Sequence, residues 1–394
     1  MNKLVLGESL DALIDHRGKT PKKLGSDFTE SGVPVASAIL VAEGVLDLSS
    51  ARRVSDAIFR KWMPIPVQEG DVLLTSEAPL GRVARVPNDE PLVLGQRLFG
   101  LRGRAGVLDN GYLYYALQTA QVRAELVGHA TGTTVVGIRQ SALRTVKIPA
   151  PAFAEQRAIA EVLGALDDKI AANRKADETI EALLSAMFDQ LASRGKDEGQ
   201  LADIAEINAK RAKPQPGGEL RYLDIASVTD GQYAPPEVSL WDDAPGRARR
   251  GLRAGDVVWS TVRPNRRSHA LVLDDDTRLV ASTGLAVLSP RGVSSAYLYQ
   301  TTKTPKFQQY LESAAEGSAY PAVRADRFAN APVAILSDEE RAAFDEVAVS
   351  ARDAQHAHLI ENEKLAATRD GLLPLLMSGK LRVKDAEKQV GEVV

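Results

Sequence analysis

The sequence EQRAIAEVLGALDDKI, residues 155–170, opens a long stretch with a regular apolar pattern. Apolar side chains recur at alternating steps of four and three residues from Ile159 to Leu191, with Asn173 and Asp177 at the two central positions. This is the heptad pattern of helices that pack side by side. A helix over residues 155–191 would be about 55 Å long at about 1.5 Å per residue. The pattern therefore predicts one long helix with a packing seam along its length.

This stretch belongs to a block that occurs twice in the chain. The tripeptide GDV at residues 70–72 recurs at residues 255–257, an offset of 185 residues. The same offset aligns residues 70–191 with the second half of the chain without a gap, and it places Glu155 on Glu340. Nearer the N-terminus the match is looser, since residues 10–21 resemble residues 201–214 at a shifted offset. Each copy therefore predicts a domain of about 150 residues followed by a long helix.

Short β-rich runs separated by Gly, Pro, Asn and Asp predict that each domain contains sheets. These runs are residues 32–41, 70–76, 134–140, 221–229, 255–261 and 278–289. One short helix is expected in each copy, at residues 111–126 and 296–312. The expected fold class is α+β: two tandem mixed α/β domains separated by a pair of long antiparallel helices, in a pseudo-two-fold internal repeat. The expected boundaries are residues 1–152 for the first domain, 153–195 for the central helix, 196–336 for the second domain, 337–383 for the C-terminal helix and 384–394 for a tail.

The two long helices allow two interpretations. Each helix could cover the core of its own domain, or the two could pair with each other, which we favour because a duplicated unit closes most simply about a pseudo-two-fold axis. Buried polar residues would then fix the register of the pair. The second helix begins with SDEE, a capping-box pattern, and Pro374 is expected to bend or end it before a C-cap at Gly379. The residues expected to pair are Ile159, Leu163, Leu166, Ile170, Asn173, Ile180, Leu184, Phe344, Ala351, His358, Asn362, Leu365 and Leu372.

Composition narrows the class of protein. The chain of 394 residues has no cysteine, which excludes disulfides and thiolate chemistry, and no run of eighteen apolar residues that would span a membrane. Its N-terminus does not resemble a signal peptide, so a cytoplasmic location is expected. The net charge is −3, yet basic residues cluster locally. Basic segments on a mildly acidic chain suit a protein that touches a polyanion at defined places.

The basic segments supply the candidate DNA-binding residues. Lys and Arg position a protein on phosphates, whereas arginine on guanine and Asn or Gln on adenine read sequence. Surface arginines are more often solvated than bound, so this assignment competes with a purely structural one. Gly132 and Gly317 precede the long helices and are explained at least as well by turns that need positive φ. The candidates are Lys19, Lys22, Lys23, Arg82, Arg85, Arg247, Arg249, Arg250, Arg263, Asn265, Arg266 and Arg267.

Motifs for catalysis are missing. The sequence has no GxxxxGK[ST] phosphate loop and no Asn/Asp-Pro-Pro-aromatic segment of an amino-methyltransferase. The Glu-x-Lys of residues 361–364 is expected on a solvated helical face. His356 and His358 are two residues apart on a helix and point to different sides, so no metal site is expected.

The order of these motifs resembles the DNA-specificity subunit of type I restriction–modification systems. The resemblance rests on PAPAFAEQRAIAEVLGALDDKI at residues 149–170, LAATRDGLLPLLMSGKLRV at residues 365–383, the GDVLLTS and GDVVWST strands, and the two glycine segments. It departs from the family in the SDEERAAF start of the second helix. The resemblance implies a non-catalytic subunit with two target-recognition domains, each reading one half of a split, asymmetric site in double-stranded DNA.

The same resemblance implies partners. The helices would set the spacer and dock two methyltransferase subunits, and restriction (helicase-nuclease) subunits would join through these. The chain itself would carry no cofactor; S-adenosylmethionine, ATP and Mg²⁺ would belong to the partner subunits. Two other classes stay open: a duplicated scaffold that binds only proteins, and a self-contained enzyme acting on DNA, which the missing motifs disfavour.

Overall fold

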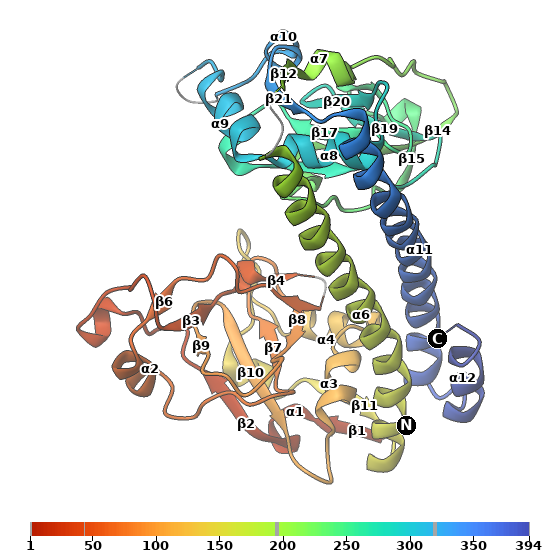
Figure 1. The fold of residues 1–394 in the computed structure, drawn as a ribbon. Helices are drawn as coiled ribbons and strands as arrows, with labels where there is room; N and C mark the ends of the chain where they lie inside the picture. The colour runs from red at the N-terminus through yellow and green to blue at the C-terminus, as the bar shows by residue number, and fades with distance from the viewer. Residues whose placement is uncertain (1, 43, 194–196, 318–320, 394) are drawn as a thin grey trace. The chain divides into compact units, whose positions relative to one another are not determined.

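The structure is a computed structural model that describes residues 2–42, 44–193, 197–317 and 321–393 (Figure 1). The chain divides into two compact units. Unit 1 is Met1–Ala171 with Glu363–Val394, and unit 2 is Ala172–Asn362. The long helices α6 (Phe153–Ala192) and α11 (Asp338–Met377) each contribute one part to each unit.

The expected pairing of the two long helices is confirmed. In unit 1, Arg369 of α11 donates to Asp167 of α6 at 2.7 Å. In unit 2, Asn173 donates to Asn362 at 2.9 Å, and a ring nitrogen of His358 lies 2.6 Å from Asp177. In unit 2 the partner numbers fall along α11 as they rise along α6, so the helices run antiparallel there.

Unit 1 is built on a sheet of strand order β2-β10-β7-β8. Successive side chains of β7 point to opposite faces, so Val72 and Leu74 pack towards α3 and α6, whereas Leu73 packs towards α2. Figure 1 shows α2 on one side of these strands and α3 and α6 on the other. The elements are β1 (Asn2–Val5), α1 (Leu6–Ser9), β2 (Leu10–Asp15), η1 (Lys22–Leu24), β3 (Val33–Ala36), η2 (Ala38–Leu40), β4 (Val41–Ala42), β5 (Val45–Leu46), β6 (Arg53–Val54), α2 (Asp56–Trp62), β7 (Val72–Thr75), β8 (Val83–Arg85), β9 (Val93–Leu94), β10 (Leu98–Gly103), α3 (Asn110–Ala116), α4 (Ala120–Gly128), α5 (Gln140–Leu143), β11 (Lys147–Ala150) and α12 (Val383–Val390).

Unit 2 repeats this plan around a sheet of order β13-β20-β17-β18. Val257 and Trp259 of β17 belong to one core and Val258 to another, as their partners in β7 do. The elements are β12 (Asp197–Gln200), α7 (Leu201–Ile204), β13 (Ala205–Ile207), β14 (Glu219–Leu223), η3 (Ile225–Ser227), β15 (Val238–Leu240), η4 (Trp241–Asp243), β16 (Ala248–Gly251), β17 (Val257–Ser260), η5 (Pro264–Arg266), β18 (His269–Leu271), β19 (Leu279–Ser282), β20 (Leu285–Pro290), α8 (Ser295–Lys303), α9 (Pro305–Ser313), α10 (Ala325–Ala329) and β21 (Pro332–Ile335).

The GDV tripeptides form the same turn in both units. Gly70 and Gly255 have positive φ angles of 80° and 91°. The following aspartates are buried, and each accepts a hydrogen bond from the backbone N–H three residues before it. A glycine that tolerates positive φ and a carboxylate that closes the turn explain why this tripeptide recurs.

The N-terminal segments of the two copies align at a different sequence offset from the expected one. Strand β1 pairs with β11, and β12 pairs with β21, so that Leu4 opposite Ile148 corresponds to Gly199 opposite Val333. The matching offset is 195 residues, and LADI of α7 corresponds to α1 rather than to residues 10–13. The offset changes because unit 1 has ten more residues than unit 2 between this segment and the GDV turn, so the sequence match at residues 10–21 was displaced.

Two other local predictions are wrong. The single helix expected at residues 111–126 is two helices, α3 and α4, because the Thr119 hydroxyl caps a new N-terminus there; Thr304 and Pro305 divide α8 from α9 in the same way. Residues 134–139 of the expected β-rich run form a loop that leads into α5, exposed at residues 134–136 and anchored by the buried Ile138. Its valines face solvent instead of packing in a sheet.

The C-terminal region differs in detail from the expected boundaries. Pro374 lies inside α11, and the helix ends at Met377, followed by Gly379 with a φ of 71°. The Ser337–Glu340 capping box at the other end of α11 is present, with hydrogen bonds in both directions. Residues 384–394, expected as a tail, include most of α12, whose Ala386 and Val390 are buried in the core of unit 1.

Candidate nucleic-acid interface

Several polar loops lie together along one edge of the unit 1 sheet, where the strands begin or end. Strands β2 and β7 end at this edge, and β10 and β8 begin there. The loops are joined by hydrogen bonds: Ile138 N–H donates to Ser76 at 2.9 Å, and Ser76 N–H donates to Arg97 at 2.9 Å. The Arg17 guanidinium donates to the Ile138 carbonyl at 3.2 Å. We name residues 16–24, 76–82, 97 and 131–139 loop edge 1.

Four of the sequence-predicted residues lie on loop edge 1. Lys22, Lys23 and Arg82 are exposed. Lys19 is half-buried, and its ammonium donates to the carbonyl of Trp62 at 2.7 Å at the end of α2, which gives it a structural role. The edge therefore presents three exposed cations from this set.

Arg85 does not join them. It ends β8 at the opposite end of the sheet, where its guanidinium lies 5.2 Å from the ring centre of Tyr114 and 4.0 Å from Asp168 of α6. Arg82 directly precedes β8 and Arg85 ends it, so the two arginines are three residues apart and lie at opposite ends of this short strand.

The corresponding edge of unit 2 holds a strongly basic loop. Residues 261–268 connect β17 to β18 and carry Arg263, Asn265, Arg266 and Arg267. Asn265, Arg266 and Arg267 are exposed, and the backbone N–H of Arg263 donates to Pro321 at 2.7 Å. We name residues 208–213, 261–268 and 321–324 loop edge 2.

Backbone conformation holds this loop in a tight shape. Arg263 and Arg267 both have a φ of 54°, in the left-handed region that few residues with a side chain adopt, and they flank the single turn of η5. Such strain is often found where a binding surface is preorganised. The exposed arginines are therefore presented from a fixed backbone.

The arginines of residues 247–250 are arranged differently from one another. Arg247 is exposed. Its carbonyl accepts from the Thr283 N–H at 2.9 Å, and the adjacent Gly284 carbonyl accepts from Thr261 of loop edge 2 at 2.9 Å, which places Arg247 beside that edge. Arg249 and Arg250 are half-buried along β16. The Arg250 Nε is buried without a hydrogen-bond partner among the described residues, and burial lowers the pKa of this guanidinium. Of the three, only Arg247 is placed like the residues of the edge.

The two edges share a framework but not their side chains. Isolated bridges join Glu77 and Thr131 to Gly137 in unit 1, and the positions 185 residues later, Val262 and Glu316, join Ala322 in unit 2. Arg82 and Arg267 also match at this offset. In unit 2, Glu316 pairs with Arg324 at 3.1 Å, whereas unit 1 has Thr131 at that position. The same scaffold therefore presents two chemically different surfaces.

Sequence reasoning did not select several cations that the structure places on these edges. Arg97 and Arg139 lie on loop edge 1, and Lys210 and Arg211 on loop edge 2. Arg139 and Arg324 were detectable, because they match at the offset of 185 and each precedes a short helix. The others fall outside the obvious basic clusters and are brought to the edge only by folding.

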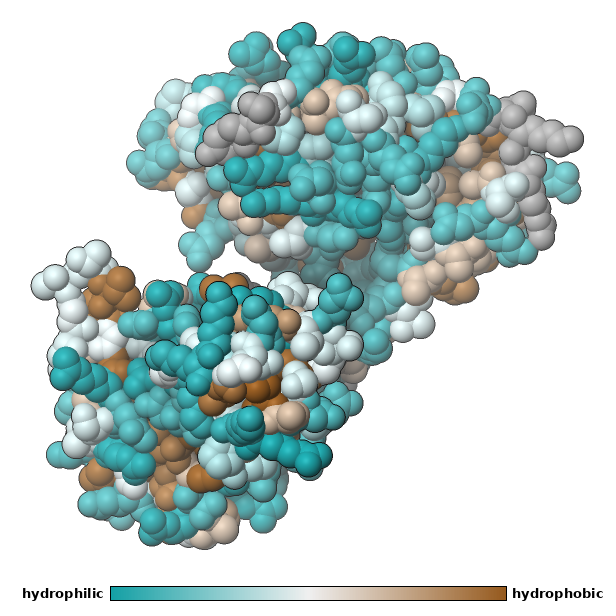
Figure 2. All heavy atoms as spheres, turned by 90° about the vertical axis from the view of Figure 1, so that its left-hand side faces the viewer, coloured by the Kyte–Doolittle hydropathy of each residue, from teal (hydrophilic) through white to brown (hydrophobic). Residues whose placement is uncertain are grey.

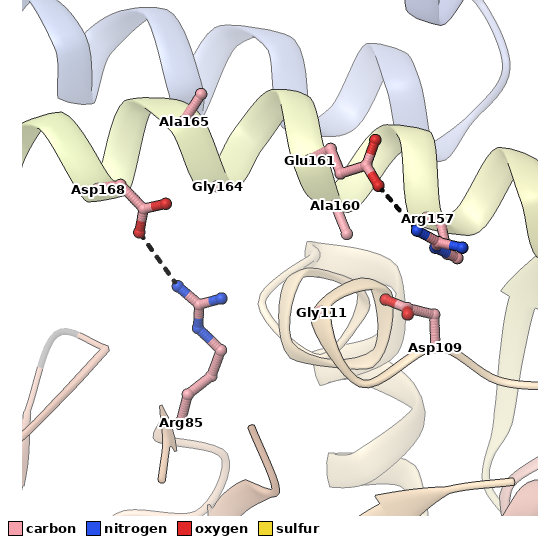
Figure 3. Close-up of a pocket in the computed structure, with 9 residues that line it drawn as sticks. All are labelled: Arg85, Asp109, Gly111, Arg157, Ala160, Glu161, Gly164, Ala165 and Asp168. Atoms are coloured by element: carbon pink, nitrogen blue, oxygen red, sulfur yellow. Dashed lines mark hydrogen bonds and ion pairs between the residues drawn. The ribbon is translucent and has the colours of Figure 1, made fainter. Parts of the chain in front are cut away.

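A separate pocket of about 350 Å³ lies in unit 1 between α6, α3 and β8 (Figure 3). Its floor is formed by the small residues Gly111, Ala160 and Gly164, and its rim carries the Arg85–Asp168 and Arg157–Glu161 ion pairs. The aligned residues of unit 2 are larger: Ala296, Asp345 and Val349. The long-helix surfaces of the two copies are thus not equivalent at this place.

The described residues lack two further kinds of feature. Among residues 2–42, 44–193, 197–317 and 321–393, no group of three or more His, Asp or Glu side chains is placed to hold a metal ion. Within the same residues, no helix is long and apolar enough to cross a membrane. On the face of unit 1 drawn in Figure 2, hydrophobic residues form separate patches among hydrophilic ones.

Comparison with known proteins gives consistent matches. The family model described as "Type I restriction modification DNA specificity domain" matches residues 8–182. The MjaVIII specificity subunit of Methanocaldococcus jannaschii is 22% identical over 376 residues, covering 87% of this chain and 88% of its own length. The MjaIX specificity subunit of the same organism is 36% identical over 177 residues, which cover 45% of this chain and 40% of that protein.

Among solved structures, a type I restriction–modification S subunit from M. genitalium superposes with a TM-score of 0.53 at 18% identity, covering 95% of both chains. At this identity the likeness concerns the fold, which is the two mixed α/β domains and two long helices described above. The chain thus resembles the type I restriction modification DNA specificity domain over residues 8–182, and over most of its length it is similar to type I restriction enzyme specificity subunits, which are the non-catalytic DNA-recognition component of their systems.

Proposed function

We propose that this chain reads a bipartite, asymmetric site in double-stranded DNA, with one unit for each half-site. The observation that carries the proposal is the repeated loop edge: the same backbone framework appears in both units with different exposed side chains. A shared framework suits one docking geometry, and different side chains suit two different base sequences.

The chemistry of the edges supports direct contact with DNA. Lys22, Lys23 and Arg82 in unit 1, and Arg247 in unit 2, are exposed cations suited to phosphates. Arg266, Asn265 and Arg267 present the guanidinium and amide groups that bind guanine and adenine edges in the major groove. The net charge of −3 does not favour binding to nucleic acid over the whole surface, so contact is expected at the basic segments.

We propose further that α6 and α11 set the unread spacer between the half-sites. The polar contacts at Asn173 and Asp177 fix the register of the two helices, because Asn173 is only 5% exposed and would lose its partner if the helices slipped. A rigid pair of helices would give one spacer length rather than a range.

The same helices are proposed to dock two methyltransferase subunits, through which restriction subunits join. Their exposed faces carry alternating charges, including Arg157, Glu161 and Asp168. The unit 2 residues that align with the small residues of the unit 1 pocket have larger side chains. The two docking contacts are therefore expected to be similar but not identical.

Domain exchange tests the half-site assignment. Residues 1–152 are replaced by the corresponding segment of another such subunit, the chimaera is expressed with its methyltransferase, and the modified sites are mapped by methylation sequencing. One half of the recognition site is expected to change while the other half and the spacer are retained. A change in both halves would refute independent reading, and a chain without sequence-specific binding would favour the scaffold alternative.

Matched insertions test the spacer. Four residues are added between positions 175 and 176 of α6 and four between positions 359 and 360 of α11, which lengthens both helices by about 6 Å. The spacer is expected to grow by roughly two base pairs, at about 3.4 Å per base pair, with unchanged half-sites. The insertion in α6 alone is the control, because it moves Asp177 out of register with His358 and should impair assembly instead.

A further inference from the structure

One loop of unit 1 combines a fixed backbone with exposed apolar side chains. Residues 131–137, TGTTVVG, form a hairpin closed by two hydrogen bonds between Thr131 and Gly137, of 2.8 and 3.0 Å. Gly132 has a φ of 112°, and a Cβ atom there would lie 2.2 Å from the carbonyl oxygen of Val135. The loop therefore has a defined shape that depends on this glycine.

The tip of the hairpin presents two valines to solvent. Val135 is 48% exposed and Val136 is 45% exposed, and the preceding residues 133 and 134 are exposed as well. β-Branched side chains have few rotamers, so they lose little conformational entropy when a partner covers them. Two adjacent valines on a closed hairpin offer a small, stiff apolar surface.

The surroundings of the hairpin indicate what covers it. Gly137 forms a bridge with Glu77, and Ile138 is hydrogen-bonded to Ser76 and Arg17, so the hairpin is part of loop edge 1. Exposed cations on the same edge include Arg82 and Arg139. An apolar tip among cations suits a partner that carries anionic groups around a recessed apolar feature.

DNA has such a feature in its major groove, the C5 methyl group of thymine, which distinguishes T·A from the other base pairs. We propose that Val135 and Val136 of the hairpin contact a thymine methyl group in the half-site read by unit 1. This inference rests on the proposed function. In the second copy the aligned positions hold Tyr320 and Pro321, so the valine contact belongs to the first half-site only.

Replacing thymine by deoxyuridine removes only the methyl group and tests the contact directly. The motif is first obtained by methylation sequencing, and domain exchange assigns one half to unit 1. The full chain in complex with its methyltransferase is then titrated with duplexes in which each thymine of that half is replaced in turn. At one position the wild type is expected to lose affinity about fourfold, as for uncovering one methyl-sized group.

The variants Val135→Ala and Val136→Ala identify the protein side of the contact. At least one of them should bind thymine and deoxyuridine duplexes equally at that position. Val238→Ala is the matched control, because Val238 is a 50% exposed valine in a strand of unit 2 and should keep the fourfold difference.

Three results would overturn the inference: a first half-site without a T·A pair, a wild type indifferent to every methyl group, or valine variants that keep the full difference. In each of these cases the wild type still binds its motif specifically, so the proposed function stands. Loss of specific binding by the wild type itself would contradict the proposed function instead.

Discussion

Replacing Glu181 by alanine is expected to destabilise unit 2 by about 3–5 kcal/mol, because it leaves a buried cation without its partner. Glu181 lies on α6 and accepts hydrogen bonds from Arg352 of α11, from Lys303 at 2.8 Å and from Gln300 at 3.1 Å. One carboxylate therefore joins both long helices to α8.

The size of this destabilisation depends on which partners of Glu181 can be hydrated after the substitution. The Lys303 side chain is 22% exposed and can be hydrated after the substitution, whereas the Arg352 side chain is only 9% exposed. Two nitrogens of Arg352, Nε and Nη2, already have no hydrogen-bond partner among the described residues. Removing its carboxylate leaves the guanidinium with the neutral Gln355 side chain as its hydrogen-bond acceptor and no negative charge, which is the condition under which breaking a buried ion pair is most destabilising.

Urea unfolding measures this effect. The fluorescence of Trp259, which is fully buried in unit 2, can be isolated by replacing Trp62 and Trp241 with phenylalanine. Glu178→Ala is the control on the same helix, since the Glu178 side chain is 61% exposed and its pairing with Lys175 is expected to contribute less than about 1 kcal/mol. A loss below about 1 kcal/mol for Glu181→Ala, or an equal loss for both variants, would refute the reasoning. Replacing Glu181 and Arg352 together by leucine should cost less than Glu181→Ala alone, because no unpaired guanidinium remains.

Three further predictions concern pH, the repeat and glycine. Burial acts to raise the pKa of Glu181, but the charges of Arg352 and Lys303 outweigh it and hold this pKa below the usual 4.5. The stabilisation by Glu181 is therefore complete above about pH 5 and is lost as the pH falls through the lowered pKa. Urea unfolding curves of the wild type and of Glu181→Ala should accordingly converge in acid. Tyr297→Phe should cost more than Tyr112→Phe in thermal unfolding, since the Tyr297 hydroxyl donates to Ala334 and also accepts from the buried Leu336 N–H, whereas Tyr112 only donates to Pro149. Gly164→Ala should stabilise α6 by about 0.5–1 kcal/mol, because no described atom beyond the adjacent residues and the backbone of the helix itself lies within 4 Å of the added Cβ. Gly132→Ala should cost about 1–3 kcal/mol, because Gly132 has a positive φ and its added Cβ would meet the Val135 carbonyl; equal effects of the two in calorimetry would contradict the assigned backbone conformations.

The order of domains and long helices is predictable from the sequence because the same arrangement occurs twice in the chain. Periodicity places α6 within a few residues of its observed bounds, and the offset of 185 holds for Tyr112 and Tyr297, whose hydroxyls make matching hydrogen bonds. Two diverged copies that keep the same spacing share one backbone fold. Identical residues at a constant offset therefore indicate the structure more strongly than local secondary-structure propensity does.

Local structure was predicted less well where tertiary contacts decide it. Residues 134–140 have the composition of a strand, yet the positive φ of Gly132 turns the chain, and no neighbouring strand pairs with the valines. Arg82 and Arg85 look like one basic cluster in sequence, but the three-residue strand β8 places them at opposite strand ends. Periodicity and charge alone do not show which end of a strand faces a binding surface.

The polar centre of the helix pair shows how duplication constrains register. Adding 185 to Asn173 gives His358, and subtracting 185 from Asn362 gives Asp177, so the Asn173–Asn362 and Asp177–His358 contacts are the same contact in the two copies. An apolar heptad seam tolerates a slip of seven residues, because one leucine replaces another. The polar contacts do not, since a slip would leave the buried Asn173 unpaired at about 1–3 kcal/mol and would break the equivalent contact at the same time. The two seam ends can therefore remain simple and apolar while a few central residues determine the pairing, and the loop edges can diverge without disturbing it.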